Sequence, residues 1–286
     1  MKGWLINSVL FKAIGPNDQF HSQDMCKSMK PSISVITVSF NAAATIADTL
    51  ASVARQTGVN YEHIVVDGGS RDSTMALVRQ HDHDRLAATS EPDAGIYDAM
   101  NKGVARATGD YLLFLNADDY LARPDALALA ADELAKTNAD CLFADTQFVG
   151  KAGTPAKQRL YSARHFAPWW LRIGAMPPHP SMFVRRTLVR DLGGFDTSYK
   201  IAGDFDLITR AVLGAGASFT KLPLVLTYFR LGGISTDGLR SKLILNRELA
   251  RSLRALGQPL SPITVWLRVP IKLLQLRQAR TRRLKS

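Results

Sequence analysis

The sequence predicts an α/β fold with a mostly parallel central sheet and helices on both faces. Between Pro31 and Leu115, short β-branched segments alternate with Ala-rich segments of helical periodicity. Such alternation is typical of parallel βαβ units with right-handed crossovers. In addition, polar side chains follow four successive predicted strands, at the edge where open α/β sheets bind ligands.

Each element of this fold is predicted from a local pattern. Residues 33–39 are rich in β-branched side chains and lie between Pro31 and Asn41, which predicts the first strand. Residues 42–56 are Ala-rich with apolar side chains at helical spacing, which predicts the first helix. The same reasoning predicts strands at 63–66, 86–90 and 111–115, helices at 72–80 and 95–107, and a later helix that opens at 203.

Length and composition bound the class of protein. With 286 residues and 46% hydrophobic content, the chain can bury a large core, as one α/β domain or a domain with an appendage. Its two cysteines, Cys26 and Cys141, are too few for a disulfide framework or a thiolate zinc site. We therefore expect a reducing, cytoplasmic setting.

The formal net charge of +11 lies at the C-terminal end of the chain. Residues 240–286 hold 12 Lys or Arg and one acid, Glu248, whereas residues 1–239 hold 24 basic and 24 acidic residues. A neutral core with a basic tail argues against a nucleic-acid partner.

Three regions are predicted: a leader at 1–31, a domain at 32–235 with halves at 32–122 and 123–235, and a basic helical tail at 236–286. Within the tail, residues 262–286 alternate apolar and basic side chains, as in a helix that lies on an anionic membrane surface. The alternative is a terminal helix packed on its own domain. No apolar run is long enough to predict a membrane span, and the leader is a poor signal peptide whose membrane contact stays open.

Ligand-type side chains follow each of the four predicted strands. In chain order they are Ser39 and Asn41, Asp67, Glu91 and Asp93, and finally Asn116, Asp118 and Asp119. Because parallel strands share a direction, these groups should meet at one edge of the sheet, which predicts a single crevice rather than four unrelated turns. The adjacent carboxylates suit a hard divalent cation, although a solvated turn is the alternative.

Two nucleotide-binding motifs are missing from the sequence. Residues 39–44, after the first strand, contain no glycine, so the Gly-x-Gly-x-x-Gly motif of dinucleotide sites is lacking, and no Gly-Lys-Ser/Thr triplet of a P-loop occurs. Carboxylates after the second and third strands suit hydrogen bonds from ribose and base, and a cation at Asp118 suits a diphosphate. The pattern predicts a nucleoside diphosphate held at both ends.

Four segments carry a family resemblance. They are Asp67-Gly68-Gly69-Ser70-x-Asp72, the segment from Ser90 to Gly103, Ala107-Thr108-Gly109-Asp110, and Leu115-Asn116-Ala117-Asp118-Asp119. In this order they resemble family 2 glycosyltransferases of the GT-A fold, the nucleotide-diphospho-sugar transferase fold, from about residue 32 to residue 228. Finer features resemble bacterial enzymes that build exopolysaccharide, lipopolysaccharide or glycolipid chains.

The resemblance implies roles for the residues after the strands. The implied nucleotide-sugar contacts are Ser39, Asn41, Asp67, Gly69, Glu91, Asp93, Gly95, Lys102, Asn116 and Ala117. Asp118 and Asp119 would hold Mn²⁺ or Mg²⁺ on the diphosphate. Asn116 stands where the family often has its first aspartate, and because an amide carries no charge, weaker metal affinity or a purely positional role is implied.

The second half of the chain should supply the acceptor side. Residues 203–207 resemble the family's Glu-Asp motif with Gly203 in place of the glutamate, which implies that Asp204 is the general base. Asp206 is the weaker catalytic candidate, and the structural alternative for Asp204 is a helix N-cap. His179 lies in a proline-rich segment that recurs in the family. It is assigned to the acceptor side, with contact to the donor phosphate or the metal, or a purely structural role, as the alternatives.

The implied reaction transfers one sugar, with inversion, from a UDP- or GDP-sugar to a saccharide or lipid-linked acceptor. It would serve bacterial surface polysaccharide or glycolipid biosynthesis, at the inner face of the cell membrane. Two other classes stay open. One is a nucleotidyltransferase that makes sugar nucleotides, which usually shows a glycine-rich loop after the first strand, whereas residues 39–44 contain no glycine. The other is a non-catalytic sugar-nucleotide or polysaccharide-binding protein, which would need no general base.

Overall fold

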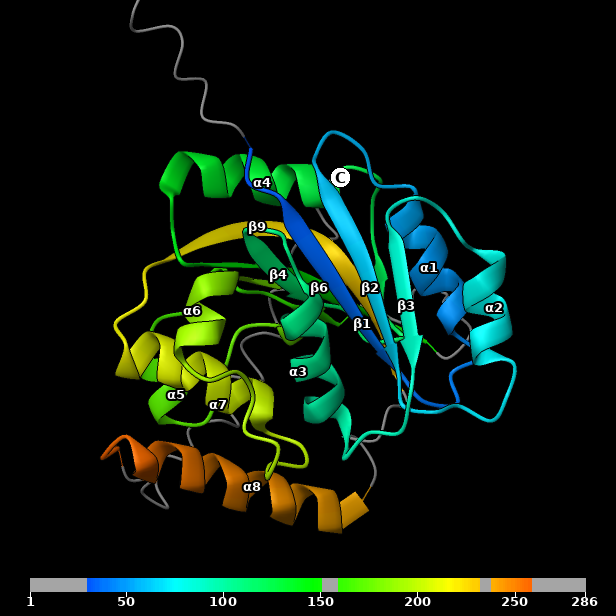
Figure 1. Ribbon diagram of the computed structural model, residues 1–286. Coiled ribbons are helices and arrows are strands. Elements are labelled where there is room, and N and C mark those ends of the chain that lie inside the picture. Colours follow the sequence, from blue (N-terminus) through cyan, green and yellow to red (C-terminus); the bar gives the residue numbers. More distant parts are fainter. Residues whose placement is uncertain (1–29, 151–158, 232–237, 259–286) are drawn as a thin grey trace, which may run out of the picture.

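The computed structural model describes residues 30–150, 159–231 and 238–258. Within them, a nine-stranded sheet runs in the order β3-β2-β1-β4-β8-β6-β9-β5, with β7 paired to β6 (Figure 1). The α/β class that the sequence predicts is confirmed.

The first half of the sheet is the predicted parallel unit. Strands β2 and β4 flank β1, β3 lies outside β2, and all three pairs are parallel. The elements are β1 (Ile33–Ser39), α1 (Ile46–Ala54), β2 (Tyr61–Asp67), α2 (Thr74–Gln80), β3 (Leu86–Ser90), α3 (Ile96–Arg106) and β4 (Tyr111–Phe114). Their carboxyl ends therefore lie at one edge.

Helix α1 begins at Ile46, later than the predicted start at residue 42. Asn41 has a left-handed φ of 49°, and the backbone N–H of Ala42 donates to Oγ1 of Thr74 over 2.8 Å. A turn fixed by this contact from α2 precedes the helix, and no local pattern in residues 42–45 indicates it.

The second half of the sheet mixes strand directions. Strand β8 is antiparallel to β4 and β6, β5 is antiparallel to β9, and β7 is antiparallel to β6, whereas β6 and β9 are parallel. The predicted parallel pairing thus holds for β3-β2-β1-β4 and for β6 with β9, and the other pairs are antiparallel. The elements are β5 (Tyr120–Leu121), α4 (Ala126–Thr137), β6 (Cys141–Val149), β7 (Leu160–Tyr161), α5 (Trp169–Arg172), the 3-10 turn η2 (His179–Ser181), β8 (Met182–Arg185), α6 (Arg186–Asp191), α7 (Gly203–Thr209), the π-helical turn η3 (Arg210–Gly214), β9 (Phe219–Arg230) and α8 (Gly238–Ala255).

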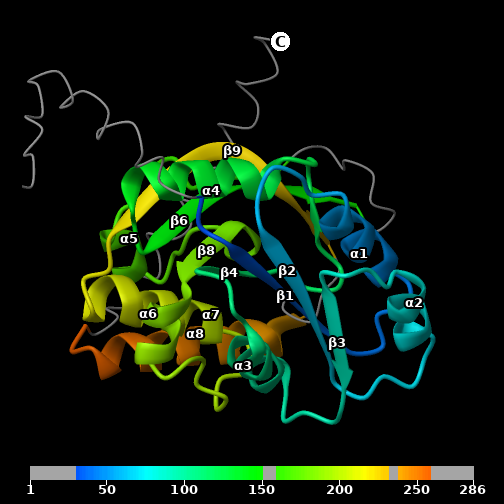
Figure 2. The ribbon, with the colours of Figure 1, turned by 45° about the horizontal axis from the view of Figure 1, so that its top comes forward.

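Helices cover both faces of the sheet. Helix α4 lies on one face, and α3, α6 and α7 lie on the other, with α8 beyond α7 (Figures 1 and 2). The core under α4 includes Leu113, Leu127 and Phe183. The opposite core includes Phe143 and Phe205 and extends to α8, which positions the start of α7 against the sheet.

Helix α8 packs on the domain, because its Leu249 and Leu253 are buried in the core beside α7. The predicted domain boundary at 235 lies outside the described residues, as do most of the leader and residues 259–286 of the tail. Of the two cysteines, Cys141 is buried and free. None of the helices in the described part combines the length and apolar composition that crossing a bilayer requires.

Candidate active site

The carboxyl ends of β1, β2 and β3 meet at the carboxylate of Asp67. Ser39 Oγ donates to Oδ1 of Asp67 over 2.9 Å, and Ser90 Oγ donates to Oδ2 over 2.7 Å. Ser70 donates its hydroxyl over 2.5 Å and its backbone N–H over 2.8 Å, and the N–H of Gly69 adds a bond of 3.2 Å. The predicted convergence of these three strand ends is therefore present.

The carboxylate of Asp67 is fully engaged within the protein. Burial raises its pKa, but the hydrogen bonds from Ser70, Ser90 and Ser39 outweigh burial, so the pKa lies below its ordinary value. An ionised carboxylate offers about four lone-pair positions, and five bonds already use them. The predicted bond from Asp67 to a nucleotide requires the exchange of one of these donors.

The loops after β1 and β2 lie side by side. The N–H of Asn41 donates to Oγ of Ser70 over 2.7 Å, and Gly69 has a φ of 80°, in the left-handed region that favours glycine. Phe40, directly after β1, is 63% exposed. Sequence reasoning missed Phe40, although an aromatic side chain next to a strand-end crevice is a signal for stacking on a flat ligand.

Asp93, after β3, lies against the glycine turn after β2. A Cβ at Gly68 would come within 2.4 Å of Oδ2 of Asp93, so a glycine is needed for the two loops to approach. Oδ1 of Asp93 accepts the N–H of Gly95 over 2.9 Å, and Gly95 has a φ of 125°. The predicted residues after the second and third strands are thus brought together.

Lys102, on α3, fastens the loop after β3. Its Nζ donates to the carbonyl oxygen of Pro92 over 2.9 Å and lies 3.4 Å from the carboxylates of both Glu91 and Asp98. The predicted approach of Lys102 to a nucleotide phosphate requires the ammonium group to leave some of these partners.

The turn between β4 and β5 carries the predicted metal ligands. Asn116 and Asp118 are half-buried, whereas Ala117 and Asp119 are buried. Burial raises the pKa of Asp118, and burial together with the charge of Asp118 raises the pKa of Asp119 well above its ordinary value. Among the described residues, Oδ1 of Asn116 and Oδ2 of Asp119 have no hydrogen-bond partner.

These unpaired oxygens fit a divalent cation. Mg²⁺ and Mn²⁺ prefer carboxylate and amide oxygens, and a cation would satisfy the buried acceptors and offset the repulsion between the two carboxylates. The described part of the chain holds no group of three or more His, Cys, Asp or Glu that could bind a metal. A cation here would therefore depend on Asn116 and on ligand oxygens as well as on the two aspartates.

Arg230, at the end of β9, is a buried cation beside this turn, and sequence reasoning missed it. Its Nη2 lies 2.6 Å from Oδ2 of Asp48, and its Nε donates to the carbonyl oxygen of Asp118 over 3.2 Å. Its backbone N–H donates to Oδ1 of Asp119 over 3.2 Å. Because Arg230 and Asp48 are 182 residues apart, no local pattern indicates this contact.

His179 lies at the same edge of the sheet. Strand β8 is antiparallel to β4, so the start of β8, directly after His179–Ser181, lies at the carboxyl end of β4. Burial lowers the pKa of His179 and the charge of Asp204 opposes this effect, which leaves a pKa below the ordinary value and a neutral ring near pH 7. Nδ1 of His179 lies 3.7 Å from Oδ2 of Asp204, beyond hydrogen-bond distance, and among the described residues it has no hydrogen-bond partner.

Asp204 lies in the first turn of α7, and the N-cap is Ala202, so the N-cap alternative for Asp204 is wrong. Oδ1 of Asp204 accepts the N–H of Phe205 over 2.8 Å. Helix α7 starts against Tyr97 of α3, because a Cβ at Gly203 would meet the Tyr97 ring at 2.7 Å. Since α3 follows the loop after β3, Asp204 lies close to the predicted nucleotide loops.

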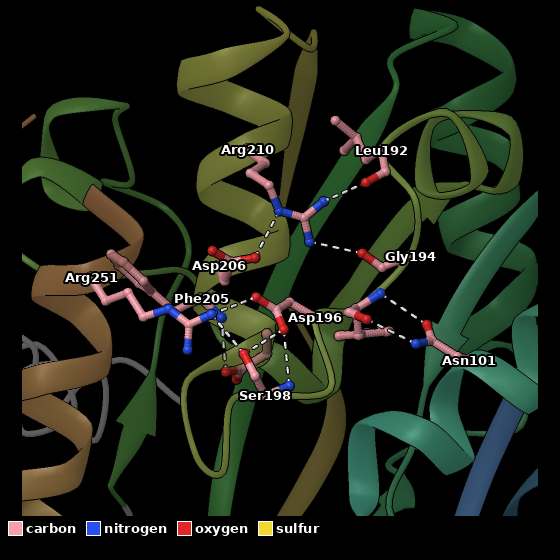
Figure 3. A network of polar contacts seen from close by, with 11 residues as sticks. Asn101, Leu192, Gly194, Asp196, Ser198, Phe205, Asp206, Arg210 and Arg251 are labelled. Atoms are coloured by element: carbon pink, nitrogen blue, oxygen red, sulfur yellow. Dashed lines mark hydrogen bonds and ion pairs between the residues drawn. The ribbon is translucent and has the colours of Figure 1, made fainter. Parts of the chain in front are cut away.

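Asp206, the second acceptor-side candidate, has a structural partner. Its Oδ2 lies 2.7 Å from Nε of Arg210, and its side chain is buried. Arg210 also donates to the carbonyl oxygens of Leu192 and Gly194, over 2.7 and 2.8 Å (Figure 3). The pair fixes the loop before α7, and a catalytic role for Asp206 stays a prediction.

Asn101, on α3, is a further residue that sequence reasoning did not single out. Its Nδ2 donates to the carbonyl oxygen of Phe195, and its Oδ1 accepts the N–H of Phe195, each over 2.8 Å (Figure 3). Its neighbour Lys102 holds the loop after β3. Helix α3 therefore connects that loop to the one that leads to Asp204.

Sequence comparisons identify relatives of this chain. A sequence model of the family described as Glycosyl transferase family 2 matches residues 34–193. The chain is 38% identical over 189 residues to an uncharacterised glycosyltransferase of Mycobacterium tuberculosis, over 64% of this chain and 70% of that protein. It is 32% identical over 233 residues to a PGL/p-HBAD biosynthesis glycosyltransferase of Mycobacterium bovis, over 78% of this chain and 84% of that protein.

Solved structures share the fold. The S. aureus protein TarS in complex with UDP-GlcNAc matches with a TM-score of 0.62 and 21% identity, over 78% of this chain and 66% of that chain. The mannosyltransferase PcManGT of Pyrobaculum calidifontis, in complex with GDP-Man and Mn²⁺, matches with a TM-score of 0.56 and 22% identity, over 89% of this chain and 83% of that chain. The matched family region runs from β1 to the end of α6 and includes the four strand ends and His179. The chain therefore belongs to glycosyl transferase family 2.

Proposed function

We propose that this transferase moves one sugar, with inversion, from a UDP- or GDP-sugar to a saccharide or lipid-linked acceptor. The main observation behind the proposal is that two distant parts of the chain meet at one edge of the sheet. The loops after β1 to β4 supply nucleotide-type contacts, and the His179–Asp204 pair supplies a carboxylate beside them. The complexes of TarS with UDP-GlcNAc and of PcManGT with GDP-Man support a nucleoside-diphosphate-sugar donor.

The base and ribose of the donor would bind at the ends of β1 to β3. Asp67 holds Ser39 and the Gly69 turn in place through its hydrogen bonds. The exposed ring of Phe40 offers a flat surface for the base, where stacking on an aromatic ring contributes about 1–3 kcal/mol. Asp93 lies beside the Gly69 turn and can accept hydrogen bonds from ribose hydroxyls.

The diphosphate would bind at the turn after β4. Asp118 and Oδ1 of Asn116 would hold Mn²⁺ or Mg²⁺, with Asp119 behind them. When bound, the ion neutralises charge on the leaving diphosphate. Arg230 would hold this turn through its bonds to the carbonyl oxygen of Asp118 and to the carboxylate of Asp119.

Asp204 would act as the general base. A bond forms between the acceptor oxygen and the anomeric carbon, the bond to the diphosphate oxygen breaks, and the acceptor proton goes to Oδ2 of Asp204. Oδ1 is held by the N–H of Phe205, which fixes the orientation of the carboxylate. An acceptor activated in this way would attack the anomeric carbon from the face opposite the leaving diphosphate, which gives inversion.

The acceptor would be a surface saccharide or lipid, reached at the inner face of the membrane. The relative from M. bovis is named for PGL/p-HBAD biosynthesis, and the positive charge of residues 262–286 suits an anionic membrane surface. These residues lie outside the described part of the chain.

A panel of UDP-, GDP- and dTDP-sugars tests the proposal. We expect at least one donor, with Mn²⁺ or Mg²⁺, to raise the melting temperature and to release its nucleoside diphosphate. Binding without release would favour the non-catalytic alternative. No response to any donor would contradict the proposed function.

A further inference from the structure

Helix α7 begins without a capping side chain of its own. Its N-cap is Ala202, whose methyl group cannot accept a hydrogen bond, although a helix start leaves up to four N–H groups without backbone partners. A carboxylate on α8 binds the N-cap residue and the two residues before it. Glu248 accepts the N–H of Lys200 at Oε1 over 2.8 Å and the N–H groups of Ile201 and Ala202 at Oε2 over 2.9 Å each.

The other amides of the first turn are also in contact with side chains. The N–H of Phe205 donates to Oδ1 of Asp204. Burial raises the pKa of Tyr97, and the N–H groups of Gly203 and Asp204, which lie toward its hydroxyl, oppose that effect. The position of the Asp204 carboxylate therefore depends on where α7 begins, and Glu248 binds the backbone at that point.

Glu248 itself has a fixed position, as a residue that positions the start of α7 requires. Its side chain is buried, and the next residue, Leu249, packs in the core beside α7. Arg251, about one turn further along α8, lies 2.8 Å from Oδ2 of Asp196 and 2.6 Å from Oγ of Ser198 (Figure 3). Helix α8 thus holds the loop before α7 at two points.

We propose that Glu248 is a positioning residue for Asp204. This inference rests on the proposed function, because it gives Asp204 the role of the proton acceptor. A displacement of about 1 Å at a reacting group can lower turnover on the order of 100-fold. The basic helix α8 thereby supports the catalytic carboxylate.

The first test measures turnover of UDP-glucose and GDP-mannose by the full chain, with water as the sugar acceptor and nucleoside diphosphate release as the readout. Glu248→Gln keeps the side-chain size but turns one accepting oxygen into an NH₂ group that faces N–H donors. We expect kcat to fall at least about tenfold while the KM for the donor stays within about twofold. Arg247→Gln, a change at an exposed neighbour on the same helix, should alter neither constant.

A double-mutant cycle separates positioning from a general effect on folding. In an Asp204→Asn background, Glu248→Gln should lower the residual turnover by less than about twofold, because its effect runs through Asp204. An equal loss in both backgrounds would overturn the proposal, as would an unchanged kcat in the single variant. Glu248→Asp, which keeps the charge on a shorter side chain, replaces Glu248→Gln in these assays if the latter does not fold.

Amide hydrogen exchange gives a readout that does not need activity. Residues 200–206 should exchange faster in Glu248→Gln than in Arg247→Gln. Unchanged exchange would overturn the positioning role even in an active enzyme. If the unaltered chain releases no diphosphate from any donor of the panel, the proposed function fails, and with it the role of Asp204, whatever the exchange shows.

Discussion

The imidazole of His179 faces the carboxylate of Asp204, with Nδ1 and Oδ2 3.7 Å apart. Burial keeps the pKa of the ring below its ordinary value, so the imidazole is neutral near pH 7. A neutral ring with its proton on Nδ1 would direct an N–H toward Asp204 without neutralising the charge of the carboxylate. We therefore expect His179 to help orient the carboxylate that we propose as the general base.

Replacement of Asp204 by Asn should separate catalysis from donor binding. We expect kcat to fall roughly 10²–10⁴-fold, because an amide cannot accept the acceptor proton. Donor affinity, measured by calorimetry, should stay unchanged. The exposed carboxylate of Asp191 gives a matched control, since Asp191→Asn should leave both quantities unaltered. A parallel loss of donor affinity in Asp204→Asn would contradict the assignment.

Asn116→Asp should strengthen metal binding. The change adds a charged ligand beside Asp118 and Asp119, where Oδ1 of Asn116 is buried without a partner among the described residues. We expect the affinity for Mn²⁺ in the presence of UDP or GDP to rise on the order of tenfold. Without metal, the added charge should lower the free energy of unfolding, as measured with urea and EDTA. Asp118→Asn should weaken metal binding, and equal Mn²⁺ affinities in all three proteins would argue against this metal site.

His63 should make the protein less stable in mild acid. Its ring is fully buried between β-strands, with Nε2 2.9 Å from Oγ1 of Thr37, and burial, with a smaller effect of His83, lowers its pKa from 6.5 to about 3. Below pH 6.5 the unfolded chain binds a proton that the folded protein does not, so this stability is present above pH 6.5 and is lost as the pH falls toward about 3.

Urea unfolding at pH 7, 6 and 5 measures this contribution. The free energy of unfolding should fall by up to about 1.4 kcal/mol more per pH unit in the unaltered protein than in His63→Gln. Identical pH dependence in the two proteins would show that His63 titrates normally in the folded state.

Removal of residues 262–286 should weaken membrane binding. Each basic residue near an anionic surface contributes about 1 kcal/mol to binding. The shortened chain should therefore sediment much less with vesicles that contain phosphatidylglycerol. For the full chain, high salt should reduce this sedimentation, because salt screens the charges. Turnover with water as acceptor should persist, because α8 stays in place. Unchanged sedimentation of the shortened chain would contradict a membrane role for this segment.

The parallel half of the fold and the order of its polar strand ends can be predicted from the amino-acid sequence alone. The predicted bounds of β1 (Ile33–Ser39) and β3 (Leu86–Ser90) agree with the structure, because alternation of β-branched and helical segments is a local property. The order of Ser39, Asp67, Asp93 and Asn116 follows from the same pattern. A shared strand direction then brings three of these strand ends together without further information.

How the second half of the chain completes the site becomes clear only from the folded structure. Antiparallel β8 brings His179 to the end of β4, and the ring of Tyr97 fills the space that a side chain at residue 203 would need, where the family motif has glutamate. Glu248 reaches Ala202 from another helix. Such contacts join residues that are far apart in the sequence, so no local periodicity predicts them. They are determined by which distant segments pack together in the folded core.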